Sequence, residues 1–220
     1  MGARTRPPLI LPRRWFDSFP SIGEPFSNFV QRSMREYDIY STKTSKWYSY
    51  LTPGDQVLPA PREAMCWTVT SADDGSSHQI IIYGGVTSGN PGLYDDSVWA
   101  ISIPSFDWVQ LTPENSTGTP GKRTSATCTL IGNKYMLGWG GIYLGTPQNS
   151  CDKDGNAVYL FDISQGEWVQ KFEPKQEYLI PENVVKVIGG RYPPGLPCRI
   201  QLTSDTAEGR HNEVCARWRI

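Results

Sequence analysis

The sequence has little of what catalysis requires. Only two histidines occur, His78 and His211, and no H-x-x-x-H, C-x-x-C or G-x-S-x-G motif is present. No glycine-rich loop opens a helix in the manner of phosphate-binding sites. A lone histidine at a strand entry is usually a solvated turn residue, and metal binding would need further ligands beside it. The sequence therefore predicts no catalytic residue, no metal site and no cofactor.

Charge excess and long apolar runs are missing as well. The 21 Lys and Arg against 22 Asp and Glu leave a formal charge of −1, which gives no general attraction to nucleic acids or anionic membranes. No apolar run approaches the roughly 20 residues that cross a bilayer. In the basic N-terminal segment the longest apolar run is LIL at 9–11, too short for a signal peptide. We expect no nucleic-acid partner and no membrane span, and a cytoplasmic location if the chain is taken literally.

The sequence does contain a repeat. Three strand-like runs, IIIYGG, YMLGWGG and VVKVIGG, each end in a glycine pair, and an apolar residue precedes a tryptophan by seven positions in three places. The glycine pairs are Gly84 and Gly85, Gly140 and Gly141, and Gly189 and Gly190; the spaced pairs are Tyr40 and Trp47, Ile101 and Trp108, and Phe161 and Trp168. A strand, a turn and a second strand ending on Trp form a hairpin. Glycine before it permits positive φ and close backbone approach.

The repeat length predicts the architecture. The three tryptophans lie 61 and 60 residues apart, and a repeat of about 50–60 residues with four strands is typical of a propeller blade. We predict complete blades at 61–111 and 123–172, and half blades at 35–50 and 181–190. Residues 1–34 are expected to be a poorly ordered extension, and 191–220 an irregular tail.

Two complete and two half blades pose a physical problem. Propellers usually close with about four to eight blades, and an open arc exposes apolar flanks at both ends. We therefore expect the chain to be a fragment of a longer propeller, to associate, or to be poorly stable.

These motifs resemble the kelch repeat. PREAMCWTV, YDDSVWAISIPSFDWVQL and ENVVKVIGG are similar to segments of kelch-repeat proteins of filamentous fungi. The resemblance covers roughly residues 35–190 and implies an all-β fold, a partial kelch propeller of four-stranded antiparallel blades. It implies little about a ligand, because kelch propellers serve unrelated roles.

The resemblance also bears on disulfides and compartment. Cys128 and Cys151 occupy positions like those of cysteines in the fungal kelch group, whose domain is often extracellular. This implies a Cys128–Cys151 disulfide where the protein meets an oxidising compartment, and Cys66 is expected to be a buried core thiol. Asn115 opens an Asn-Ser-Thr glycosylation acceptor in a connector between blades.

The expected function is that of a non-catalytic scaffold that binds a protein partner, or a surface glycan, through loops on a rigid frame. The candidate loops are 86–96 and 142–155, which carry Tyr94 and Tyr143, and the connectors 52–62 and 112–123.

Two alternatives come from resemblance. Longer fungal relatives often carry a signal peptide and a membrane span, which implies an extracellular, cell-surface or wall-associated protein of which this chain is a truncated product. Galactose oxidase also contains kelch-like blades, and its copper is held by two His and two Tyr. Two isolated histidines argue against that enzyme.

Overall fold

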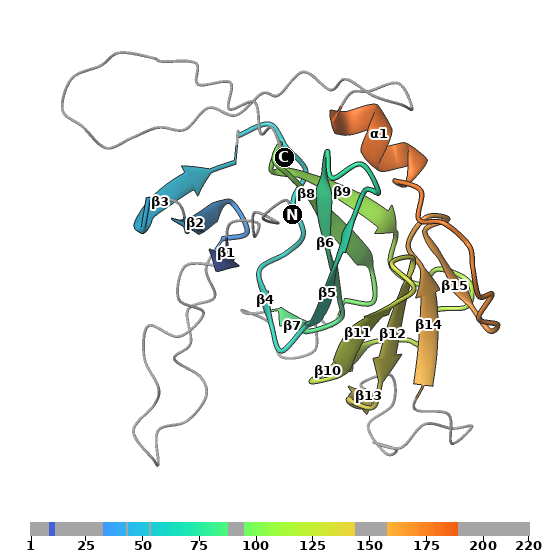
Figure 1. The fold of residues 1–220 in the computed structure, drawn as a ribbon. Helices are drawn as coiled ribbons and strands as arrows, with labels where there is room; N and C mark the ends of the chain where they lie inside the picture. Colours follow the sequence, from blue (N-terminus) through green and yellow to red (C-terminus); the bar gives the residue numbers. More distant parts are fainter. Residues whose placement is uncertain are drawn as a thin grey trace.

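The computed structural model describes residues 33–42, 44–52, 54–87, 95–143 and 158–188 and the backbone of Leu9–Leu11. Its described part consists of antiparallel strands and one short helix, which confirms the all-β class (Figure 1). The first sheet has the order β1-β2-β3: β1 (Leu9–Leu11), β2 (Glu36–Ser41) and β3 (Lys46–Leu51).

Two four-stranded sheets follow, each built in the same order along the chain. The second sheet comprises β5 (Cys66–Ser71), β6 (His78–Tyr83), β8 (Val98–Ile103) and β9 (Asp107–Thr112). The third comprises β11 (Thr127–Ile131), β12 (Tyr135–Trp139), β14 (Val158–Asp162) and β15 (Glu167–Val169). Two small ribbons join β4 (Arg62–Glu63) to β7 (Val86–Thr87) and β10 (Arg123–Thr124) to β13 (Ile142–Tyr143).

The seven-residue spacing before each tryptophan is a matter of strand register. The two residues of each pair stand directly opposite across a hairpin: Tyr40 and Trp47, Ile101 and Trp108, Phe161 and Trp168. The turns are also equivalent: an N–H four residues on donates back at 2.7–2.8 Å, from Ser45 to Ser41, Phe106 to Ser102 and Gly166 to Asp162. The donor residue has positive φ in all three turns. Three repeats thus share one hairpin geometry.

Two apolar cores lie between the sheets. One packs Tyr37, Ile39 and Tyr50 of the first sheet against Ile101 and Trp108 of the second. The other packs the opposite side of the second sheet against the third, and its largest side chains include Tyr83, Met136 and Phe161. The β8–β9 half of the second sheet is therefore covered on both sides, as expected for a blade between neighbours.

The half blade predicted at 181–190 is wrong over Glu182–Ile188, which form helix α1. Pro181 and Glu182 provide a helix start, with a proline at the boundary and an acid in the first turn. Val184 and Ile188 are four residues apart, and both belong to the second core. The i,i+4 spacing buries one helical stripe, and this outweighs the strand preference of the β-branched residues. Gly189 and Gly190 lie outside the described residues.

Two further features differ from or extend the sequence analysis. The apolar Leu9–Leu11, within the segment expected to be irregular, form β1 and pair with β2; the rest of 1–32 and all of 189–220 lie outside the described residues. Among the residues described, no helix has both the length and the apolar character needed to cross a bilayer.

Replacing Phe161 by Ala should lower the free energy of unfolding by about 3–5 kcal/mol, because its fully buried ring leaves a cavity beside Trp168. Urea denaturation measures the change. Val57→Ala, at an exposed connector position, is the control and should stay within about 0.5 kcal/mol of the parent. Equal effects of the two substitutions would contradict the core assignment.

Candidate interaction surface

Three of the four candidate segments leave the same end of the two four-stranded sheets. The loops after the glycine pairs leave the ends of β6 and β12, and the connectors leave β3 and β9. Since neighbouring strands are antiparallel, the ends of β6 and β9 lie on the same side of the second sheet, toward the small ribbons at the lower edge in Figure 1. The connector after β3 begins at the other edge, where the Gln56 side chain bonds to Asp107 and Trp108 of the β8–β9 hairpin. We call the described residues 60–65, 84–87, 95–97, 112–126 and 140–143 the connection face.

A buried arginine organises the second repeat's part of the connection face. The guanidinium of Arg62 donates to the carbonyl oxygens of Ala60 at 3.1 Å and Gly84 at 3.3 Å, and forms an ion pair with Asp95. Asp95 also accepts the N–H of Ser97 at 2.6 Å. Burial lowers the pKa of Arg62, while Asp95 opposes this shift. The pair thus ties the connector, the glycine pair and the far end of the following loop to one point.

Arg123 occupies the corresponding place in the third repeat. It donates to the carbonyl oxygens of Pro120 at 3.1 Å and Gly140 at 3.4 Å. Its guanidinium carbon also lies 5.4 Å from the ring centroid of Tyr143 and 5.2 Å from that of Tyr159, within cation–π range. Burial raises the pKa of Tyr159 to about 12 against the opposing charge of Arg123.

The glycine pair at 84–85 is the junction between the second and third repeats. The N–H of Gly85 donates to the carbonyl oxygen of Arg123 at 2.8 Å, and a Cβ on Gly84 would lie 2.5 Å from the same oxygen. Both glycines have positive φ, 72° and 99°, a backbone conformation that residues with a side chain rarely adopt. A second backbone bond, from Ser125 N–H to the Ala64 carbonyl at 2.8 Å, lies beside the first.

Sequence reasoning missed the two arginines. Arg62 and Arg123 are 61 residues apart, the same interval as Trp47 and Trp108. Aligning the repeats on the tryptophan that precedes each arginine, Trp47 or Trp108, would have placed Arg62 and Arg123 at the same position, just before the first strand of each blade. Their shared role was hidden because arginine is usually exposed.

The second acid of the pair at 95–96 fixes the connector. Asp96 is buried and accepts the Asn115 N–H at 3.0 Å and the Thr119 hydroxyl at 3.5 Å. The two acids therefore tie down neighbouring backbone. Asn115 itself is exposed, so its side chain is accessible for glycosylation.

Of the two candidate tyrosines, only Tyr143 lies within the described residues. It is half-buried, and a Cβ on Gly121 would lie 2.6 Å from its ring, so the tyrosine packs on the connector as well as under Arg123. Tyr94 lies outside the described residues.

The disulfide differs from the one that the resemblance implied. Cys128 is bonded to Cys66, with their Cα atoms 5.4 Å apart; Cys151 lies outside the described residues. β5 and β11 are the first strands of neighbouring sheets, and their cysteines both belong to the core between those sheets. The Cys128–Cys151 prediction is therefore wrong, because β11 faces β5 across this core.

The described residues include few side chains that could act in catalysis. His78 is half-buried, which lowers its pKa, and its Nδ1 lies 2.7 Å from the Ser71 hydroxyl directly opposite on β5. His211 is outside the described residues. In the part of the chain that the structure describes, no three His, Cys, Asp or Glu side chains lie close enough together to hold a metal ion.

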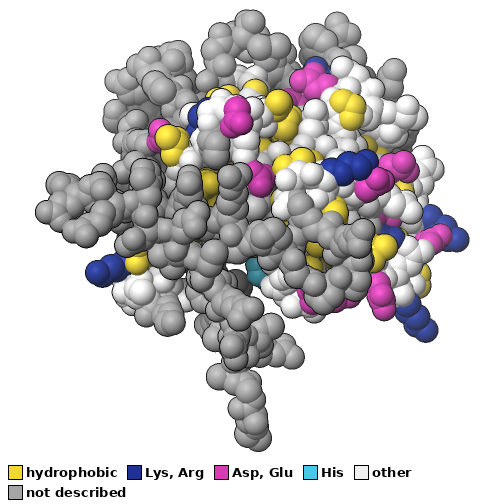
Figure 2. All heavy atoms as spheres, turned by 90° about the horizontal axis from the view of Figure 1, so that it is seen from above, with side chains coloured by type: hydrophobic (Ala, Val, Ile, Leu, Met, Phe, Trp, Pro, Cys, Tyr) yellow, Lys and Arg dark blue, Asp and Glu magenta, His cyan; other side chains and the backbone are white. Residues whose placement is uncertain are grey.

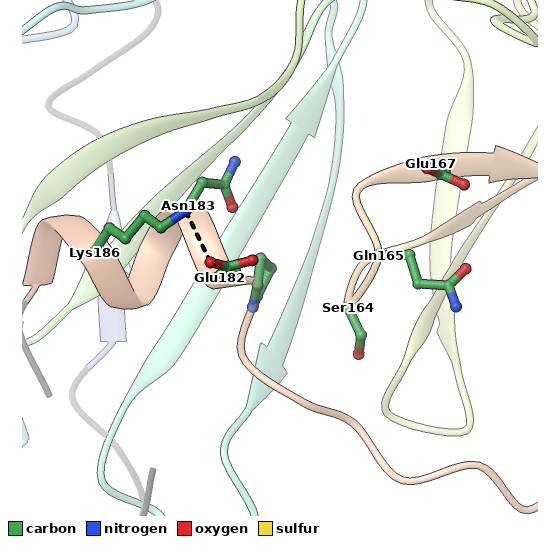
Figure 3. Close-up of a pocket in the computed structure, with 7 residues that line it drawn as sticks. Ser164, Gln165, Glu167, Glu182, Asn183 and Lys186 are labelled. Carbon is green, nitrogen blue, oxygen red and sulfur yellow. Dashed lines mark ion pairs between the residues drawn. The ribbon is translucent and has the colours of Figure 1, made fainter. Parts of the chain in front are cut away.

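A hollow lies away from the connection face, between α1 and the β14–β15 hairpin (Figure 3). Glu182 and Lys186 at its rim form an exposed ion pair of 2.8 Å along the helix, which contributes little to binding or stability. The charged and polar residues that line it are exposed or half-buried: Ser164, Gln165, Glu167, Glu182, Asn183 and Lys186. This lining lacks the buried polar groups that orient a ligand.

Comparison with known proteins finds similar sequences. A kelch repeat-containing protein of Arthroderma benhamiae is 34% identical over 149 residues, covering 66% of this chain and 21% of the relative. Host cell factor 1 of Rattus norvegicus and of Homo sapiens is 27% identical over 130 residues, covering 56% of this chain and 6% of the relative. No family model matches. The repeats are kelch repeats.

The kelch assignment has a defined extent. The chain spans about one fifth of the fungal kelch protein and a much smaller share of host cell factor 1. Among solved structures, a chain of the cryo-EM structure of RAG in complex with one melted RSS and one unmelted RSS aligns with a TM-score of 0.44 at 18% identity, over 63% of this chain and 44% of that one.

Replacing Arg62 by Met should destabilise the kelch repeats by about 3–5 kcal/mol, because Asp95 would then be a buried carboxylate without its cation. Lys122→Met is the control: its pair with Glu114 is 3.5 Å long and partly exposed, and its loss should cost about 1 kcal/mol or less. Chemical denaturation of both variants measures the difference. A cost for Arg62→Met no greater than for the control would show that the buried pair does not organise this face.

Removing the disulfide with Cys66→Ser and Cys128→Ser should lower the free energy of unfolding by about 4 kcal/mol, the loop-closure value for a separation of 62 residues. Thermal melting with and without a reductant should show the same loss in the parent chain and none in the double variant. Peptide mapping of oxidised protein that joins Cys128 to any cysteine other than Cys66 would contradict the pairing.

Proposed function

We propose that this kelch-repeat chain is a non-catalytic scaffold that binds a protein partner through the connection face. The proposal rests on one observation: side-chain contacts fix the connector in both repeats, and in the second repeat they fix the following loop as well. In each repeat one arginine holds the connector and the glycine carbonyl, and in the second repeat Asp95 adds the following loop. Loops anchored on a rigid frame bind without a large ordering cost.

The composition of the connection face supports a protein partner. Ile142 is an exposed apolar side chain on it, and Glu114 and Lys122 of the same face carry opposite charges 3.5 Å apart. Figure 2 shows the side away from the connection face, seen from above, and there too acidic and basic side chains of the described surface are intermixed rather than gathered by sign. Mixed charge with an apolar anchor suits protein surfaces, whereas nucleic acid calls for a basic patch.

A second candidate, an extracellular or cell-surface kelch protein, has support from one observation. The Cys66–Cys128 bond joins neighbouring repeats, and such bonds persist in oxidising compartments. The exposed Asn115 acceptor is compatible with the same compartment. A surface glycan is the partner class that this candidate adds.

The test uses two variants with equal numbers of new charges. Ile142→Asp places one carboxylate on the connection face, whereas Val187→Asp places one at a similarly exposed position on α1. Each chain serves as bait in extracts of cells that express the gene, followed by quantitative mass spectrometry. We expect a protein recovered by the parent and by the α1-side variant to fall at least tenfold with the connection-face variant. Equal recovery by all three baits would refute the proposal.

A further inference from the structure

The repeat allows equivalent positions of the sheets to be compared. We call the side of a sheet that faces the preceding repeat its leading face, and the other side its trailing face. In the second sheet Ile101 and Trp108 lie on the leading face, in the core shared with β2 and β3. Val98 and Ala100 lie on its trailing face, in the core shared with the third sheet.

The same contact, leading face on trailing face, occurs twice inside the molecule. Phe161 and Trp168 are the third sheet's equivalents of Ile101 and Trp108, and they pack on the trailing face of the second sheet. The leading face of the second sheet packs in turn on Tyr37 and Ile39, the trailing face of the β2–β3 hairpin.

The leading face of the β2–β3 hairpin is open at the equivalent position. Its matching pair, Tyr40 and Trp47, stacks with ring centroids 5.0 Å apart. Trp47 is 56% exposed, whereas its equivalent Trp108 is 8% exposed. The leading side of β5 is open as well: Trp67 is exposed, while Cys66 and Thr68 beside it are buried on the opposite side.

The trailing face of the third sheet is open at the other end. Trp139 and Val158 stand opposite each other in the register of β12 and β14. Their equivalents in the second sheet, one repeat earlier, are Tyr83 and Val98. Trp139 is 47% exposed against 1% for Tyr83, and Val158 is 61% exposed against 0% for Val98. Besides the open leading side of β5, the chain thus presents an unfilled leading face on the β2–β3 hairpin and an unfilled trailing face on the third sheet.

We propose that a second copy of this chain fills both, each copy placing its leading face on the trailing face of the other. The argument for this occupant is that the two open faces are the two halves of a contact already made twice inside the chain. A two-fold pair fills the hairpin's leading face and the third sheet's trailing face in both copies. The hairpin and two sheets of each copy contribute three repeat positions, and six positions lie within the range of about four to eight at which propellers close.

This contact does not depend on the proposed function, because the connection face lies at the strand ends and the open faces lie on the sheet sides. Binding of a partner and pairing of two copies can therefore fail separately.

The first experiment measures the mass of the full chain by sedimentation. We expect twice the 24.7 kDa of one chain. Trp47→Asp and Trp139→Asp should each give the single-chain mass, because each removes one half of both contacts in a pair. Val187→Asp, on an exposed helix position of similar exposure, is the control and should keep the double mass. Near-ultraviolet circular dichroism shows whether each variant keeps its packed aromatic core.

The second experiment mixes the two variants. A Trp47→Asp copy retains its trailing face and a Trp139→Asp copy retains its leading face, so the mixture should form a one-to-one pair through one intact contact, at lower affinity than the parent pair. A parent chain that is a cooperatively melting monomer overturns the proposal, and so does an open series of higher oligomers. Persistence of the double mass in either folded variant alone also overturns it, because the contact would then join two identical faces.

Discussion

The carbonyl oxygen of Arg123 lies against the glycine pair of the preceding repeat, and the arrangement of the repeats depends on this approach. A Cβ at Gly84 would be within 2.5 Å of that oxygen, and the Gly85 N–H donates to it. Within the third repeat, a Cβ on Gly141 would come within 2.8 Å of the Thr124 carbonyl, as one on Gly85 would come within 2.7 Å of the Glu63 carbonyl. The glycine pairs are therefore contacts of backbone with backbone, and they set how closely entry strand and blade can approach.

From that contact the other features follow in order. The short strand that precedes each blade, β4 or β10, carries the buried arginine, Arg62 or Arg123. That arginine in turn holds the connector and the glycine carbonyl. The chain thus has an ordered frame at one end of the sheets and open apolar sides at both ends of the arc. These two surfaces differ in chemistry: the first combines charges with an isolated apolar residue, and the second repeats the composition of a core.

The sequence alone predicted the features that depend on local spacing. The seven-residue interval follows from a hairpin whose two residues stand in register, and it was readable in all three repeats. Helix α1 was missed because β-branched residues before a glycine pair outweighed the proline and acid that start it. The disulfide was missed because it joins different sheets, and such pairing depends on how sheets pack. One signal was available: the 62-residue separation of Cys66 and Cys128 is close to one repeat length.

The same separation orders events during synthesis. At about 5–20 residues per second, Cys128 follows Cys66 from the ribosome by about 3–12 s. A hairpin closes in about 1–10 μs, so β5 and β6 can pair long before β11 has been made. Cys66 therefore remains a thiol, on a sheet whose trailing side is still uncovered, until Cys128, the next cysteine along the chain, has been made. Correct pairing is consequently a late step, which follows the docking of the third sheet.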